Sequence, residues 1–259
     1  MKHTRALAIV FLASAAACLG AAYVTDFESP PFFSGPINSQ DGWTTPSAVE
    51  STARIQTDFE ISSYLTNAGI TPGVPVHSGV QALLVSGAGA SSATIRAISD
   101  LELEQVVRLE VWARPLNNGT SGAAMGNIFL TMEDSSGERA AAFRFGFVNG
   151  IQTIDYGTEI AGIWQATGLV WNETTWYRLT LVVDYSQKTY DFLVDGVQVN
   201  ASPIAFYTSL SDDFRQIRIF RGSNQAGMII DDLSVVPEPG SGAVFLAAVS
   251  VLGLRRRRP

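Results

Sequence analysis

The chain has 259 residues, of which 46% are hydrophobic and 16% are charged, and its formal net charge is −7. Six of its 17 basic residues lie at the two ends, so residues 6–254 carry 11 basic against 24 acidic side chains, a charge of about −13. This acidic middle argues against nucleic acid or anionic lipid as its partner.

The N-terminal segment has the pattern of a secretory signal peptide. A basic start at Lys2 and Arg5 is followed by an apolar run, Ala6–Cys18, and by small residues at Gly20 and Ala22. The run is shorter than the roughly 20 residues that a membrane-spanning helix needs. We expect export with cleavage after Ala22 or, as a second choice, after Gly20; lipidation of Cys18 is an alternative. Cleavage after Ala22 leaves no cysteine, so the mature chain would rely on its core and not on disulfides.

Between residues 23 and 235 the sequence predicts one β-rich domain. Segments rich in β-branched and aromatic residues are bounded by Gly, Asn, Asp or Ser, which is typical of strands. The clearest are Val106–Pro115, Asn127–Asp134, Arg139–Gly150, Trp176–Tyr185, Thr189–Val199 and Phe214–Gly222. A helical turn or two is expected within Arg54–Gly69. No linker or repeat divides this part of the sequence, so we predict a single antiparallel sandwich of two sheets.

Several of these segments resemble the laminin-G/concanavalin A-like jelly rolls. "ETTWYRLTLVVDYSQKTYDFLVDGVQV" (Glu173–Val199) is similar to their central hairpin, and its Asp195-Gly196 pair is a strong turn signal. "VVRLEVWARP" (Val106–Pro115) resembles their strand with an inward Trp before Pro. The segments around Asp26 and Asp231 resemble the opening and closing strands. The resemblance implies an all-β, two-sheet antiparallel jelly-roll sandwich whose first and last strands pair. Lectins, adhesins, enzymes and structural modules share this fold.

Catalytic patterns are weak, and we predict no catalytic residue. His77 is the single histidine left after signal cleavage, and no Gly-x-Ser-x-Gly motif accompanies it. Asp100, Glu102 and Glu104 alternate, as the carboxylates of laminarinase-like glycoside hydrolases do, but Asp replaces the first Glu of that pattern and Glu the middle Asp. We therefore interpret these three as a solvated acidic face.

Four carboxylates form a candidate calcium site. Asp26 and Glu28 lie on the expected opening strand, and Asp231 and Asp232 lie on the closing one. They would converge if those strands pair, and carboxylate oxygens suit Ca²⁺. The alternative is that they are ordinary charges at a sheet edge.

Two tryptophans form a candidate sugar-binding site. Trp164 and Trp171 lie in "GIWQATGLVWNET", between strands, where exposed rings would stack on sugar faces. Burial in the core is the alternative for both. Trp112 and Trp176 fall within predicted strands and are expected in the core.

The C-terminal segment has three elements in a fixed order. Pro237, Glu238 and Pro239 are followed by an apolar stretch, Ala243–Leu254, that is too short for a comfortable permanent span. The last element is the cluster Arg255, Arg256, Arg257 and Arg258. This order resembles the PEP-CTERM sorting signal of Gram-negative and related bacteria. The resemblance implies a short hydrophobic helix inserted transiently in the inner membrane, and processing by an exosortase.

The sequence thus predicts a signal peptide over 1–22, a β-sandwich domain over 23–235 and a sorting tail over 236–259. We expect a non-catalytic protein of the cell envelope, surface or extracellular matrix that binds or scaffolds extracellular polysaccharide, as in a biofilm. A polysaccharide-active hydrolase or lyase on the same fold is one alternative, and a protein-binding adhesin is another. Apart from the Ca²⁺ considered above, no cofactor is expected, and no nucleic-acid partner.

Overall fold

The structure is a computed structural model that describes residues 23–46, 53–86, 92–98, 106–117, 128–148, 151–159, 163–221 and 226–238. Three predicted features lie outside the described residues. They are the signal peptide, the alternating carboxylates Asp100, Glu102 and Glu104, and the sorting tail from Pro239 onward.

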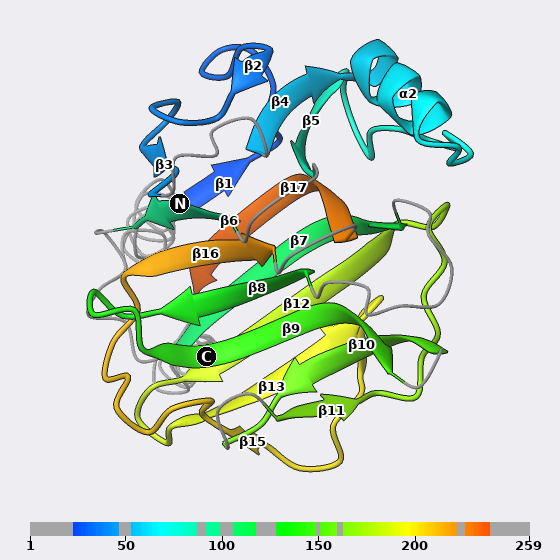
Figure 1. The fold of residues 1–259 in the computed structure, drawn as a ribbon. Coiled ribbons are helices and arrows are strands. Elements are labelled where there is room, and N and C mark those ends of the chain that lie inside the picture. Colours follow the sequence, from blue (N-terminus) through cyan, green and yellow to red (C-terminus); the bar gives the residue numbers. More distant parts are fainter. Residues whose placement is uncertain are drawn as a thin grey trace, which may run out of the picture.

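The described chain folds into two antiparallel sheets (Figure 1). The main path of the ten-stranded sheet is β14 (Val197–Gln198), β13 (Thr189–Val194), β12 (Tyr177–Asp184), β7 (Val106–Asn117), β17 (Ala226–Pro237), β5 (Gln81–Val85), β4 (Ala53–Thr57) and β2 (Gly35–Pro36). Off this path, β1 (Tyr23–Thr25) pairs with β17, and β15 (Ile204–Ala205) pairs with β13.

The seven-stranded sheet lies in front of the other in Figure 1. Its order is β11 (Trp164–Ala166), β10 (Ile151–Gly157), β9 (Arg139–Val148), β8 (Ile128–Glu133), β16 (Gln216–Arg221), β6 (Ser92–Ala97) and β3 (Trp43–Thr44). Together the two sheets form the jelly-roll sandwich that the sequence predicts.

The core lies between the sheets and follows from the alternation of side chains along each strand. On β16, Ile217 and Ile219 are fully buried, whereas Arg218 between them points to the other face. Phe143 of one sheet stacks on Phe192 of the other, with ring centroids 5.8 Å apart. Burying a side chain of this size stabilises the fold by roughly 1.5–3 kcal/mol.

Two expectations about strand pairing are confirmed. The opening and closing strands pair, with Tyr23 opposite Val235. Asp195 and Gly196 both adopt positive φ, 52° and 82°, as a tight hairpin turn between β13 and β14 requires.

The predicted helix lies within Arg54–Gly69, as expected, and is longer than a turn or two. Residues 54–57 belong to β4, and α2 spans Asp58–Asn67. The side chain of Thr57 caps α2 and accepts a hydrogen bond from the backbone N–H of Glu60. In turn, the side chain of Glu60 accepts one from the backbone N–H of Thr57. Ile61 and Leu65 bury one face of α2 in a second apolar cluster with residues of β5 and β17. In the part of the chain described above, no helix has the length and apolar character to cross a membrane.

Candidate functional site

The outer face of the seven-stranded sheet carries a row of side chains in register across four strands. Asp155 on β10 lies opposite Arg144 on β9, Arg144 opposite Phe129 on β8, and Phe129 opposite Phe220 on β16. Their chain neighbours, such as Ile154 and Phe143, point the other way into the core. The alternation that builds the core therefore also builds this face.

Aromatic rings on this face form a continuous group. Phe129 stacks on Phe220 at a centroid distance of 4.7 Å and contacts Trp164 at 5.6 Å. Trp164 in turn contacts Tyr207 at 6.0 Å. Phe129 and Tyr207 are buried, whereas Trp164, on the edge strand β11, is partly exposed. The group therefore reaches solvent at the ring of Trp164.

Arg144 links this aromatic group to a buried carboxylate. Its Nε donates to Oδ2 of Asp155 at 2.7 Å, and its Cζ lies 4.7 Å from the ring centroid of Trp164. Asp155 is 1% exposed, and neither its Oδ1 nor the hydroxyl of nearby Thr153 has a hydrogen-bond partner. A Cβ at Gly146 would lie only 2.5 Å from Oδ2 of Asp155, so a side chain there would displace this pair.

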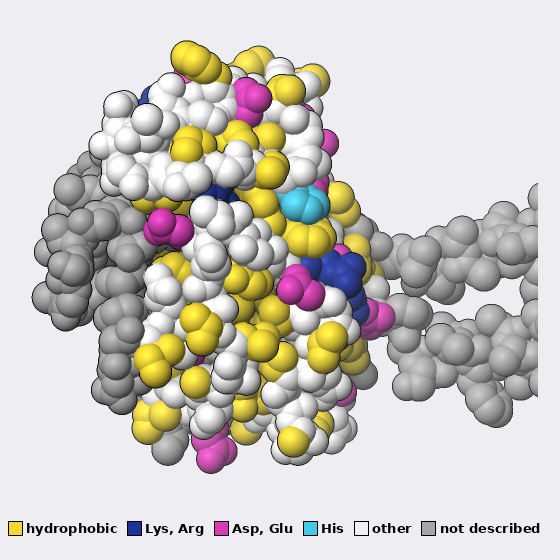
Figure 2. Space-filling view, turned by 90° about the vertical axis from the view of Figure 1, so that its right-hand side faces the viewer, with side chains coloured by type: hydrophobic (Ala, Val, Ile, Leu, Met, Phe, Trp, Pro, Cys, Tyr) yellow, Lys and Arg dark blue, Asp and Glu magenta, His cyan; other side chains and the backbone are white. Residues whose placement is uncertain are grey.

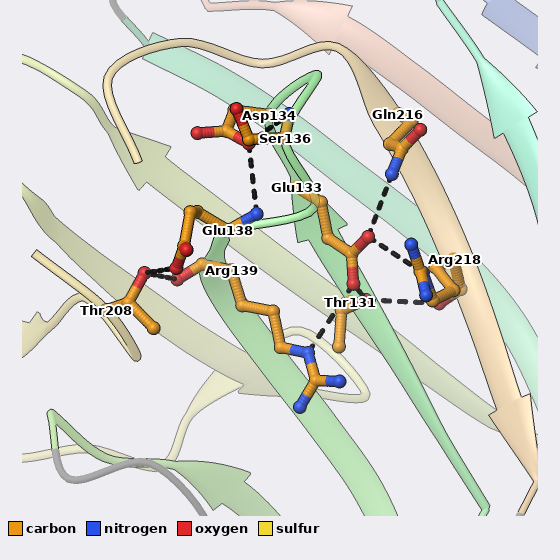
Figure 3. A network of polar contacts seen from close by, with 9 residues as sticks. All are labelled: Thr131, Glu133, Asp134, Ser136, Glu138, Arg139, Thr208, Gln216 and Arg218. Atoms are coloured by element: carbon orange, nitrogen blue, oxygen red, sulfur yellow. Dashed lines mark hydrogen bonds and ion pairs between the residues drawn. The ribbon is translucent and has the colours of Figure 1, made fainter. Parts of the chain in front are cut away.

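A second buried carboxylate, Glu133, organises the neighbouring part of the face (Figure 3). Its Oε2 accepts hydrogen bonds from Nε of Arg218 at 2.8 Å and from Gln216 at 2.9 Å. Its Oε1 accepts one from Thr131 at 2.7 Å and lies 3.5 Å from Nε of Arg139. These contacts offset the cost of burying a charge. Both oxygens are engaged, so Glu133 is a positioning group and not a free acid or base.

Arg139 and Arg144 are held in the same way. Each has Nε against a buried carboxylate and its guanidinium against aromatic rings; Cζ of Arg139 lies 5.4 Å from the centroid of Phe129 and 5.5 Å from that of Tyr207. Within the described residues, their terminal Nη atoms make no hydrogen bond. We call Phe129, Arg139, Arg144, Trp164 and Tyr207 the arginine–aromatic face. Of these five, only Trp164 was singled out from the sequence.

Trp171, the other candidate sugar-binding tryptophan, belongs to the core. It is 3% exposed, its Nε1 donates to the carbonyl of Gly146 at 2.9 Å, and its ring contacts Phe145. Its neighbours Leu169 and Val170 are exposed instead. Figure 2 shows that apolar side chains gather on the surface at one side of the sandwich. The core alternative therefore holds for Trp171.

Of the four carboxylates expected near calcium, Asp231 and Asp232 lie on β17, whereas Asp26 and Glu28 follow the end of its partner strand β1. All four bind the chain itself. Glu28 accepts from the backbone N–H groups of residues 80 and 81, and Asp26 accepts from that of Glu28. Asp231 accepts from the backbone of His77 and Ser78. Across the described ranges, no three His, Cys, Asp or Glu side chains are grouped to hold a metal ion. In this arrangement the carboxylates accept hydrogen bonds from the chain itself, and calcium binding at this place stays a prediction.

His77 and Ser78 do not form a nucleophilic site. Nδ1 of His77 lies 2.6 Å from one oxygen of Asp232, and the hydroxyl of Ser78 donates to the other at 2.7 Å. Both side chains thus contact the carboxylate and not one another, so the histidine is not placed to activate the serine. Burial raises the pKa of the adjacent Asp231 to about 7.

Trp112 is not in the core between the sheets, which corrects the expectation from the sequence. It lies on the outer face of β7, partly exposed, and His77 stacks on it with ring centroids 3.9 Å apart. Trp176 precedes β12, is also partly exposed, and donates from Nε1 to the carbonyl of Val74 at 2.9 Å. Both tryptophans therefore contact the segment that precedes β5, at His77 and at Val74.

The first residues of the predicted sorting motif continue the sandwich. Pro237 is the last residue of β17 and lies opposite Val107. The N–H of Glu238 donates to the carbonyl of Val106 at 3.0 Å, and its carboxylate lies 3.6 Å from Arg108. Pro239, Arg255, Arg256, Arg257 and Arg258 lie outside the described residues.

Comparison with known proteins identifies a shared fold. No protein-family model and no curated protein matches the chain. A sialidase structure superposes with a TM-score of 0.56 and 12% identity, over 83% of this chain but 18% of the sialidase. A mutant of the alginate lyase Aly36B in complex with alginate tetrasaccharide superposes with a TM-score of 0.49 and 11% identity, over 84% of this chain and 97% of the lyase. The lectin UEA-II complexed with galactose superposes with a TM-score of 0.49 and 10% identity, over 83% of this chain and 98% of the lectin. At these identities the likeness concerns the fold alone.

Proposed function

We propose that this protein binds extracellular polysaccharide, without turning it over, through the arginine–aromatic face. The observation that carries the proposal is the partly exposed ring of Trp164, which extends the aromatic group of Phe129 and Tyr207 to solvent beside Arg144. An aromatic ring next to hydrogen-bond donors suits a sugar, which has an apolar face and a polar rim.

The state of the carboxylates on this face favours binding over catalysis. A glycoside hydrolase needs two carboxyl groups placed on either side of the scissile bond, one of them as an acid. Glu133 and Asp155 are both buried and paired with arginines, so they position other groups and do not reach toward a substrate. Sialidases and lyases are nevertheless found among the proteins of similar fold, so turnover has to be measured.

The test is a panel of soluble neutral and acidic polysaccharides offered to the full-length protein, with binding followed by affinity electrophoresis and turnover by release of reducing ends. We expect binding to at least one member and no release. Trp164→Ala should weaken that binding by about tenfold, and Trp164→Phe should restore part of it.

Trp112→Ala is the matched control, because it removes a partly exposed tryptophan from the outer face of the other sheet. It should leave the affinity unchanged. Equal losses in Trp164→Ala and Trp112→Ala, or no binding by the wild type, would contradict the proposal. Release of reducing or unsaturated ends would identify the protein as an enzyme instead.

We also propose that the protein is exported and sorted by an exosortase-type enzyme to the cell envelope, surface or matrix. The proposal is supported by the order of elements in 1–22 and 236–259 and by the way β17 leads directly into the tail. Mass spectrometry of the secreted protein should find the arginine cluster removed in a host with an exosortase and retained in one without. The same C-terminus in both hosts would contradict it.

A further inference from the structure

We infer that the bound polysaccharide is acidic, with carboxylate groups along its chain, and that Arg139 and Arg144 bind those groups. This inference rests on the proposed function and names the class of ligand. It comes from how the two guanidinium groups are held.

Each guanidinium is held at Nε by a buried carboxylate, and the side chains of Arg139 and Arg144 are 29% and 11% exposed. Nε of Arg144 donates to Asp155 at 2.7 Å, and Nε of Arg139 lies 3.5 Å from Oε1 of Glu133. Aromatic rings lie against both groups and restrict their rotation. In the described chain no residue accepts a hydrogen bond from their Nη atoms. A guanidinium edge with two such donors matches a carboxylate in geometry and charge.

Burial of the two carboxylates makes this arrangement rigid before any ligand arrives. Glu133 is fully buried and is also held by Thr131, Gln216 and Arg218, so it stays in place beside Arg139. Asp155 lies under Arg144 with its Oδ1 unpartnered. A site whose charges are already oriented loses less conformational entropy when the ligand binds.

The surroundings of the two arginines distinguish an acidic from a neutral sugar. A neutral sugar offers hydroxyl oxygens to the two guanidinium groups, whereas a carboxylate offers them two oxygens and a negative charge. An acidic sugar uses both the ring and the donors. The charge of about −13 on residues 6–254 opposes a polyanion at long range, but at physiological ionic strength this repulsion is screened beyond about 8 Å, so the local arginines decide.

The test compares polygalacturonate with its methyl ester, because esterification removes the charge and leaves the sugar ring unchanged. Isothermal titration of the full-length protein should give an affinity for polygalacturonate at least about tenfold above that for the ester. Raising NaCl to about 0.5 M should weaken only the first interaction.

Two variants test the role of the arginines in binding without disrupting the fold. Arg139→Gln leaves Glu133 with its three other partners, so it should fold and lose about tenfold in affinity for polygalacturonate. Arg144→Lys keeps a positive charge beside Asp155 but lacks the fork of donors, and should lose affinity similarly. Arg108→Gln changes a partly exposed arginine on the outer face of β7, paired with Glu110 at 2.9 Å, and should bind as the wild type does.

Other outcomes overturn the inference in distinguishable ways. If acid and ester bind equally, or if Trp164→Ala loses binding while the arginine variants keep it, the ligand is not recognised by its charge and the proposed function stands. If only neutral polysaccharides of the panel bind, the inference of an acidic ligand is likewise wrong and the proposed function stands. If nothing in the panel binds, the proposed function fails as well.

Discussion

The two sheets use tryptophan and charged side chains on their outer faces for different purposes. On the ten-stranded sheet, Trp112, Trp176, Asp231 and Asp232 are engaged with the segment that precedes β5. On the seven-stranded sheet, the carboxylates hold arginines whose terminal donors have no partner in the described chain. The comparison shows that residue type alone does not identify a binding site; what matters is whether polar groups are already satisfied.

The largest expected effect separates the two candidate sugar-binding tryptophans. Trp171→Ala removes a ring that is 3% exposed and should lower the free energy of unfolding by about 3–5 kcal/mol. Trp164→Ala removes a partly exposed ring and should cost about 1 kcal/mol or less while weakening glycan binding. Urea denaturation measures both. A greater stability loss in Trp164→Ala than in Trp171→Ala would reverse the assignment of core and surface.

A smaller loss is expected from Arg114, which serves structure on the ten-stranded sheet. Arg114 is fully buried and donates to the carbonyls of Thr71, Pro72, Val74 and Glu173. Arg114→Gln leaves most of these carbonyls without a donor and should destabilise the fold by about 3 kcal/mol. Arg108→Gln serves as the control and should change stability by less than about 0.5 kcal/mol. Similar urea midpoints for the two variants would mean that the hydrogen bonds of Arg114 contribute little to stability.

The buried carboxyl of Asp231 should make stability depend on pH. Burial raises its pKa to about 7, against about 3.9 in an unfolded chain. Between these values the folded state keeps a proton that the unfolded state has lost, so the free energy of unfolding should fall as pH rises from about 4 to about 7. Relative to Asp231→Asn, which cannot titrate, the wild type should lose stability progressively over this window. A wild type that gains stability relative to the variant as pH rises would contradict the assignment.

The smallest expected effect is that of chelator. Because Asp26, Glu28, Asp231 and Asp232 accept hydrogen bonds from the chain, removing calcium with EDTA should shift the melting temperature by less than about 1 °C. A fall of several degrees that added Ca²⁺ reverses would show that a cation displaces these hydrogen bonds.

Strands with regular alternation were predictable from the sequence. Five of the six segments chosen for their β-branched and aromatic content contain β8, β9, β12, β13 and β16. The sixth, Val106–Pro115, covers all of β7 except its last two residues. The position of Trp112 was predictable in the same way, because Val107, Leu109 and Val111 alternate with Arg108, Glu110 and Trp112. The resemblance to a strand with an inward-facing tryptophan predicted that Trp112 is in the core, whereas the alternation correctly places it on the outer face.

The arginine–aromatic face could not be predicted because it depends on pairings distant in sequence. Arg144 meets Asp155 only when β9 and β10 align, and Glu133 meets Arg218 across 85 positions of the chain. Short strands such as β2, β3 and β11 give no periodic pattern to detect. Hydrophobic alternation indicates which face of a strand is polar, but not which polar residues on that face meet.

Hydrogen–deuterium exchange of the full-length protein, with and without polygalacturonate, tests most directly whether the arginine–aromatic face binds the glycan. Protection is expected in peptides covering β8, β9 and the Trp164 strand β11, with little change in residues 71–80 or in β12. Protection confined to residues 71–80 and β12 would place the glycan on the opposite sheet and contradict the assignment.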